Sequence, residues 1–133
     1  MKTQRTQIGI IGSGPAGLLL ARLLQLEGID AVVLERQSRG HVESRIRAGV
    51  LEQGTVEMLR VANASARMER EGLPHAGFSL AFAGRRERID MAQLTGSGVM
   101  VYGQTEVTRD LINTILADGG ELWYEAPALA VED

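Results

Sequence analysis

The sequence predicts an α/β fold that begins with a parallel βαβ unit. Residues 6–11 form a nearly continuous apolar run, which is typical of a parallel strand buried on both faces. Residues 15–27 follow with apolar positions spaced for a helix, and Gly28 stands where helix ends favour a left-handed residue. Residues 31–34 form a second apolar run. We therefore expect two parallel strands joined by a helix, with the right-handed crossover that such units prefer.

The next stretch departs from simple alternation of strands and helices. Residues 36–49 are polar, basic and punctuated by glycine, and we expect a short helix or a loop there. The apolar spacing of residues 51–62 predicts a helix. Residues 64–70 predict a second short helix after a break near Asn63.

An inserted β-hairpin is expected in the middle of the chain. Residues 78–82 alternate between large apolar and small side chains, which is the period of a half-exposed strand. Gly84 and Arg85 predict a turn, and residues 86–90 predict the returning strand.

The last third of the chain returns to alternating strands and a helix. Residues 99–102 predict a strand, and residues 105–117 predict a helix that ends at residues 118–120. Residues 122–124 and 128–131 predict two further strands. The sequence ends directly after this last strand signal, so we expect the 133 residues to be an incomplete domain.

Composition excludes several classes of function. Fourteen basic residues against seventeen acidic ones give a net charge of -3, which offers no overall attraction to nucleic acid. The absence of cysteine excludes disulfides, thiolate zinc sites and cysteine nucleophiles, and it fits a cytoplasmic protein. Glycines and Arg22 interrupt the apolar stretch near the start, so we expect neither a signal peptide nor a membrane span. His41 and His75 lack the spacing with carboxylates that a metal site requires.

The turn after the first strand carries the pattern G-x-G-x-x-G. Gly12 permits a sharp turn, Gly14 lets backbone approach a pyrophosphate, and Gly17 lets the helix pack closely on the strand. Glu35 closes the next strand, where its carboxylate can accept hydrogen bonds from a ribose. These features together predict a Rossmann-like dinucleotide site, although the pattern alone does not separate NAD from FAD.

A second signature lies at residues 45–54. Arg45 and Arg47 flank one residue in an expected loop, from which they could form charge-assisted hydrogen bonds with phosphate oxygens. Ala48 and Gly49 are small enough to let a flat ring lie against the backbone. On composition alone, a solvated basic loop is the alternative.

Four runs of sequence resemble those of the flavoprotein aromatic hydroxylases. They are IGSGPAGLLL at residues 11–20, VLERQ at 33–37, RIRAGVLEQG at 45–54 and VYGQTEVTRDL at 101–111. The resemblance covers nearly the whole chain and is closest to members that hydroxylate 4-hydroxybenzoate to 3,4-dihydroxybenzoate. It implies FAD as cofactor, NADPH or NADH as co-substrate, and a small aromatic substrate with O2 as reactants. The oligomeric state stays open, with a homodimer among the options for a full-length parent.

The resemblance also implies which residues bind cofactors. They are Gly12, Gly14, Ala16, Gly17, Glu35, Arg36, Gln37, Arg45, Ile46, Arg47, Ala48, Gly49, Val50 and Gln104. The glycines would cradle the pyrophosphate beside Ala16, and Glu35 would hold the adenosine ribose. Arg47 would contact the pyrophosphate, residues 48–50 would offer backbone to the isoalloxazine, and Gln104 would contact the ribityl or pyrophosphate region.

The resemblance also implies where the nicotinamide co-substrate docks and which family motifs lie outside the 133 residues. Arg36, Gln37 and Arg45 lie where NADPH docks in the family, and His41 stands where NADPH-preferring members commonly have Tyr, so the preference stays open. The family's second flavin motif and its substrate contacts lie beyond residue 133, so we expect the chain alone to be inactive. An NAD-binding dehydrogenase domain and a non-catalytic truncated remnant remain alternatives.

Overall fold

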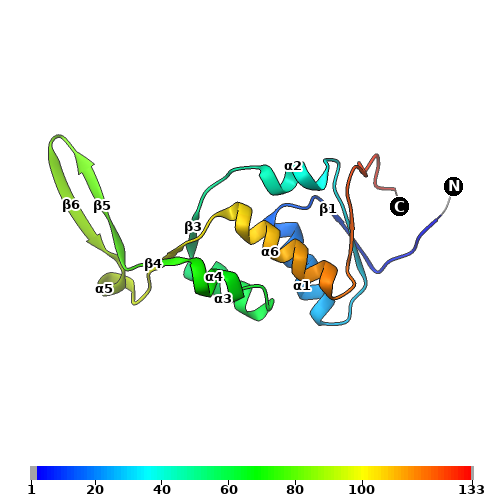
Figure 1. Ribbon diagram of the computed structural model, residues 1–133, viewed down its shortest axis with the longest axis horizontal. Helices are drawn as coiled ribbons and strands as arrows, with labels where there is room; N and C mark the ends of the chain where they lie inside the picture. Colours follow the sequence, from blue (N-terminus) through cyan, green and yellow to red (C-terminus); the bar gives the residue numbers. More distant parts are fainter. Residues whose placement is uncertain (1–2, 133) are drawn as a thin grey trace.

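The chain opens with the expected βαβ unit in the computed structural model, which describes residues 3–132 (Figure 1). Strand β1 (Ile8–Ile11) pairs in parallel with β2 (Ala31–Leu34), and β2 pairs in parallel with β8 (Glu121–Trp123). The sheet order is β1-β2-β8, so the strand that is last in the chain completes the sheet beside β2. The α/β fold with a parallel βαβ start is confirmed.

Two helices cover this sheet and meet each other in the core. Helix α1 (Pro15–Leu26) connects β1 to β2, and α6 (Gln104–Ala117) packs along it (Figure 1). Both helices place large apolar side chains in one buried cluster, together with β2, α3 and α4. The largest fully buried members are Leu18, Val33, Val56, Leu59, Met68, Leu111, Ile112 and Ile115. This core fixes the ends of α1 and α6 relative to the sheet.

A second, antiparallel sheet corrects the expected helix over residues 51–62. Strand β3 (Val50–Glu52) comes first, and α3 (Gln53–Val61) begins only after it. Residues 51 and 52 are extended because they pair with β7 (Val99–Val101), with Leu51 opposite Met100. A partner from far along the chain therefore overrides the helical spacing.

The other edge of β7 carries a strand that the sequence did not predict. Strand β4 (Leu73–His75) pairs antiparallel with β7 and gives the sheet order β3-β7-β4. Helix α4 (Ala66–Glu71) precedes it, close to the range expected from residues 64–70. Proline at position 74 suits β4, because this strand lies at an edge of the sheet.

The expected hairpin is confirmed and projects from the body of the molecule (Figure 1). Strands β5 (Gly77–Phe82) and β6 (Arg85–Asp90) form an antiparallel pair of their own. The turn lies one residue earlier than expected, at Ala83 and Gly84, whose φ angles of 46° and 71° are both positive. A short helix, α5 (Met91–Thr95), follows the hairpin and was not predicted.

The remaining segments include one wrong prediction. Residues 39–44 form the short helix α2 (Arg39–Ser44), one of the two conformations expected there. Residues 128–131 form no strand, and Leu129 and Val131 are 92% and 86% exposed. Their alternating pattern lacks a neighbouring strand to pair with among the described residues. Across residues 3–132, no helix is long and apolar enough to cross a membrane.

Candidate functional site

A cleft of about 940 Å³ lies at the carboxyl ends of β1 and β2. Ligands of open α/β sheets bind at this edge, because the loops that follow parallel strands converge there. The cleft gathers predicted site residues from four separate segments of the chain. They are Gly12, Gly14, Glu35, Arg36, Gln37, Arg45, Arg47 and Gln104.

The glycine turn shapes the floor of the cleft. Gly12 has a φ of 103°, and its N–H donates to the carbonyl of Leu34 at 2.8 Å, which ties the turn to β2. A Cβ at Gly17 would lie closer than 3.0 Å to the carbonyl oxygen of Gly12 and 3.3 Å from Ile10 Cγ2. A Cβ at Gly14 would meet no atom within 4 Å. Gly17 therefore serves packing, whereas the space above Gly14 is open to a ligand.

The start of α1 is arranged to bind an anion. Gly14 is the N-cap and Pro15 occupies the first turn. Within residues 3–132, no side chain caps this helix end, and its first turn holds no acidic residue. Helix N-termini present N–H groups without intrahelical partners and the positive end of the helix dipole, so this end favours a phosphate.

Glu35 is held at the end of β2 by three hydrogen bonds. Its Oε2 accepts from the N–H of Ser13 at 3.0 Å and from Ser13 Oγ at 3.1 Å, and Oε1 accepts from the N–H of Gln37 at 2.9 Å. Burial opposes the charge, but these hydrogen bonds and the neighbouring Arg36 keep the pKa of Glu35 below its ordinary value. A carboxylate has about four acceptor positions, so about one remains for a ribose hydroxyl.

Ser13 is the clearest cleft residue that the sequence did not predict. It is 1% exposed and supplies two of the three hydrogen bonds to Glu35. The available signal was a polar side chain between two glycines of a buried turn, since a buried hydroxyl requires a partner. Thr108 was missed as well, although it lies one helical turn after Gln104 and lines the same cleft.

The arginine segment, residues 45–50, is fixed through its carbonyl groups. The N–H of Tyr102 donates to Gly49 at 2.9 Å, and the N–H of Gln104 donates to Ala48 at 3.0 Å. These bonds leave the side chains of Arg45 and Arg47 to line the cleft. In the part of the chain that the structure describes, neither arginine forms an ion pair, and the same holds for Arg36.

Six predicted site residues do not line the cleft. They are Ala16, Gly17, Ile46, Ala48, Gly49 and Val50. Ile46 is 89% exposed on the loop, and Val50 is 58% exposed in β3. The carbonyls of Ala48 and Gly49 accept from the N–H groups of Gln104 and Tyr102, so these two residues support the neighbouring arginines. Contacts of residues 48–50 with an isoalloxazine remain a prediction.

Comparison with known proteins identifies the family of the chain. Residues 5–132 match the family model described as the FAD binding domain, and the chain belongs to this family. FAD is the cofactor of the family, with a reduced nicotinamide as the typical co-substrate. The expected resemblance to flavin-dependent hydroxylases is confirmed, and the match favours FAD over the NAD-binding alternative.

One relative with a similar sequence and two solved structures with a similar fold can be compared with the chain. The chain is 45% identical over 134 residues to p-hydroxybenzoate hydroxylase of Acinetobacter baylyi, covering 100% of this chain and 33% of that protein. Pseudomonas aeruginosa PqsL in complex with 2-aminobenzoylacetate superposes with a TM-score of 0.87 at 20% identity, over 97% of this chain and 36% of that one. p-Nitrophenol 4-monooxygenase PnpA of Pseudomonas putida DLL-E4 gives 0.86 at 21% identity, over 100% and 35%. The two structures show the shared fold, and the chain spans about a third of each relative.

The residues of the cleft fit FAD chemically. A helix N-terminus without a cap and an open space above Gly14 suit a pyrophosphate. Arg45 and Arg47 add positive charge that no described carboxylate neutralises. Glu35 keeps about one acceptor position for the adenosine ribose. The cleft volume also lies within the range usual for small-molecule sites.

Proposed function

We propose that the chain is the FAD-binding part of a flavin-dependent aromatic hydroxylase. The whole protein would convert 4-hydroxybenzoate to 3,4-dihydroxybenzoate with NADPH or NADH and O2. The observation that carries this proposal is the cleft at β1 and β2, where the glycine turn, Glu35 and the arginine segment meet. The identity of the substrate rests on the hydroxylase that is 45% identical to this chain over 134 residues, a third of that protein.

Each side of the cleft has a separate task in holding the cofactor. The N-terminus of α1 and the bare backbone at Gly14 bind the pyrophosphate. Arg47 adds a charge-assisted hydrogen bond to the same group. Glu35 accepts from the adenosine ribose while Ser13 holds its carboxylate in place. Gln104, at the first position of α6, contacts the ribityl or pyrophosphate region.

Bound FAD would supply the redox chemistry, taking electrons from the reduced nicotinamide and activating oxygen. The residues of this chain bind and orient the cofactor, and we assign none of them as catalytic acid, base or nucleophile. Arg36, Gln37 and Arg45 lie on the α2 side of the cleft, where an anionic nicotinamide dinucleotide would meet positive charge. His41 lines the same side and would influence the choice between NADPH and NADH.

The proposal is tested by titrating the apoprotein with FAD and following the visible absorbance and fluorescence of the flavin. Replacing Glu35 or Arg47 by Ala should raise the Kd for FAD by roughly tenfold to a hundredfold, because each removes a hydrogen bond to a charged group. Arg86→Ala is the matched control, since Arg86 is exposed on the β5–β6 hairpin outside the cleft. Equal affinity in all three variants would contradict the assigned site.

The reaction requires a second assay on the whole protein. We expect 4-hydroxybenzoate to stimulate NADPH or NADH oxidation and 3,4-dihydroxybenzoate to accumulate in the same amount. If FAD binds but only another aromatic acid is hydroxylated, the class of enzyme stands and the substrate assignment fails. If the wild-type protein binds no FAD, the proposal fails as a whole.

A further inference from the structure

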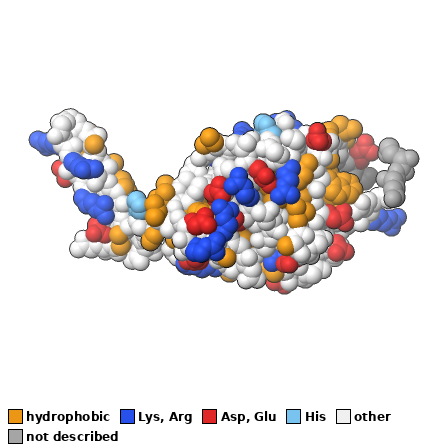
Figure 2. Space-filling view, in the orientation of Figure 1, with side chains coloured by type: hydrophobic (Ala, Val, Ile, Leu, Met, Phe, Trp, Pro, Cys, Tyr) orange, Lys and Arg blue, Asp and Glu red, His pale blue; other side chains and the backbone are white. Residues whose placement is uncertain are grey.

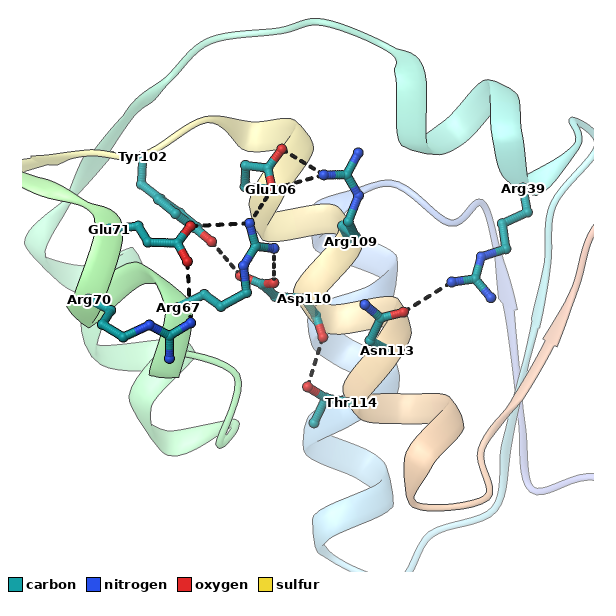
Figure 3. A network of polar contacts seen from close by, with 10 residues as sticks. All are labelled: Arg39, Arg67, Arg70, Glu71, Tyr102, Glu106, Arg109, Asp110, Asn113 and Thr114. Carbon is teal, nitrogen blue, oxygen red and sulfur yellow. Dashed lines mark hydrogen bonds and ion pairs between the residues drawn. The ribbon is translucent and has the colours of Figure 1, made fainter.

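A network of charged side chains surrounds a buried tyrosine beside the cleft (Figure 3). Tyr102 follows β7, is 6% exposed, and donates its hydroxyl to Asp110 Oδ2 at 2.6 Å. Arg67 of α4 donates through Nη1 to the other oxygen, Asp110 Oδ1, also at 2.6 Å. Burial and the Asp110 carboxylate raise the pKa of Tyr102 above its ordinary value, so the hydroxyl stays protonated and acts as donor.

The network extends over the surface between α4 and α6. Arg67 also forms ion pairs with Glu106 and Glu71, and Arg109 donates to both oxygens of Glu106 at 2.8 and 2.9 Å. In Figure 2, basic (blue) and acidic (red) side chains lie intermixed near the centre of the face that it shows. The network thus ties α4 to the first two turns of α6.

Residues 102–105, which adjoin this network, also hydrogen-bond to the arginine segment of the cleft. The N–H groups of Tyr102 and Gln104 donate to the carbonyls of Gly49 and Ala48. Thr105 Oγ1 donates to the carbonyl of Arg45 at 3.3 Å. Residues 45–49 are therefore attached to the backbone that the network holds, and a shift of this backbone would move Arg45 and Arg47.

We propose that Tyr102, Asp110 and Arg67 are positioning residues that set the place of the arginine segment for FAD. The inference rests on the proposed function, and it assigns to these residues a task beyond packing. Buried ion pairs contribute little net stability, because removing a carboxylate from water costs about as much as the pairing returns. Apolar side chains could fill the same space without that cost. The polar contacts instead fix the relative position of two segments. Asp110, 8% exposed, accepts from Tyr102 after β7 and from Arg67 of α4 through separate oxygens.

Tyr102→Phe tests the proposal, since it removes one hydroxyl and keeps the ring. The Kd for FAD should rise by up to about tenfold, because the lost hydrogen bond is internal to the protein and can contribute no more to FAD binding than its own free energy. Asp118→Asn is the matched control. Asp118 ends the same helix and pairs with the buried Arg22 at 2.6 Å, far from the cleft. This control should lower the unfolding midpoint of the apoprotein and leave the Kd for FAD unchanged.

Asp110→Asn serves as a second variant, because it keeps the shape of the side chain but has one acceptor oxygen for two donors and no negative charge to pair with Arg67. If Tyr102→Phe does not fold, the Kd of Asp110→Asn decides. A raised Kd in either variant with an unchanged Kd in Asp118→Asn supports positioning. A wild-type Kd in both, or an equal rise in Asp118→Asn, overturns it. Loss of FAD binding by the wild-type protein would instead refute the proposed function.

Discussion

Replacing Gly17 by Ala would place a methyl group where the structure has no room. The new Cβ would lie inside the 3.0 Å that real Cβ atoms keep from the carbonyl oxygen of Gly12, and 3.3 Å from Ile10 Cγ2. The obstacle is backbone, and Gly12 is itself bonded to Leu34 at 2.8 Å. Relief therefore requires movement of the turn relative to β2. Forced backbone shifts cost about 1–3 kcal/mol.

The opposing effect is smaller than this cost. Alanine is a better helix former than glycine by about 1 kcal/mol in a helix interior, and by less in the first turn, where Gly17 lies. We expect a net loss of about 1–2 kcal/mol in the free energy of unfolding. The turn that shifts is the floor of the cleft, so the Kd for FAD should rise as well.

Gly14→Ala provides the contrasting variant in the same turn. Its Cβ would meet no atom within 4 Å, and its φ of -72° suits alanine. Alanine is a poorer N-cap than glycine but restricts the unfolded chain more, and these opposing effects should keep the change in the free energy of unfolding below about 1 kcal/mol. The methyl group would nevertheless occupy the space proposed for the pyrophosphate, so FAD affinity should fall at least about tenfold.

Urea denaturation of the apoproteins and FAD titration measure the two effects independently. Gly17→Ala should lose both stability and affinity, whereas Gly14→Ala should lose affinity alone. A Gly17→Ala protein as stable as the wild type would refute the packing argument. A Gly14→Ala protein with wild-type affinity would show that the pyrophosphate does not lie over this turn.

Three further substitutions follow from single observations. The pKa of Glu35 is lowered in the folded state, so its ionised carboxylate stabilises the fold at pH values above the ordinary pKa of 4.5, and this stabilisation is lost as the pH falls through the folded-state pKa. Glu35→Gln should therefore weaken the fall of the urea midpoint at acid pH. Tyr124 has a buried hydroxyl that finds no partner within residues 3–132, so Tyr124→Phe should raise the free energy of unfolding by about 1 kcal/mol; a loss of similar size would contradict this. Ala83 has a φ of 46° and forms the two-residue turn of the β5–β6 hairpin together with Gly84. Asn accepts a positive φ better than Ala, so Ala83→Asn should slow amide exchange in the hairpin, and faster exchange would count against the turn assignment.

The first half of the parallel sheet could be predicted because its signals are local. Buried strands appear as apolar runs, and the turn between them needs glycines for reasons that concern neighbouring residues only. Strands β3 and β4 gave no strand signal, because β3 adjoins a helical spacing of apolar residues and β4 contains Pro74. Their conformation is set by β7, which lies about 25 to 50 positions away. Residues 128–131 show the reverse error, since a strand pattern without a neighbouring strand does not form a strand.

The candidate site divides in the same way. The backbone at Gly14 and the carboxylate of Glu35 could be placed from spacing, because β1, α1 and β2 fix their positions. Ser13 could not, since its bond to Glu35 joins residues 22 positions apart through side-chain geometry. The Arg67–Asp110 contact spans 43 positions and leaves no periodic trace.

The contacts of the arginine segment and those of the polar network meet at the start of α6, so one short stretch of chain supports both. Tyr102 and Gln104 donate backbone N–H groups to the arginine segment, and Thr105 donates its hydroxyl. These residues also bear or adjoin the polar network. A substitution there acts on stability and on the cleft together. The opposite end of α6 holds its own ion pair, between Arg22 and Asp118, and neither of these two residues lines the cleft. Stability and FAD affinity should therefore separate along the length of one helix, with affinity responding only near its N-terminus.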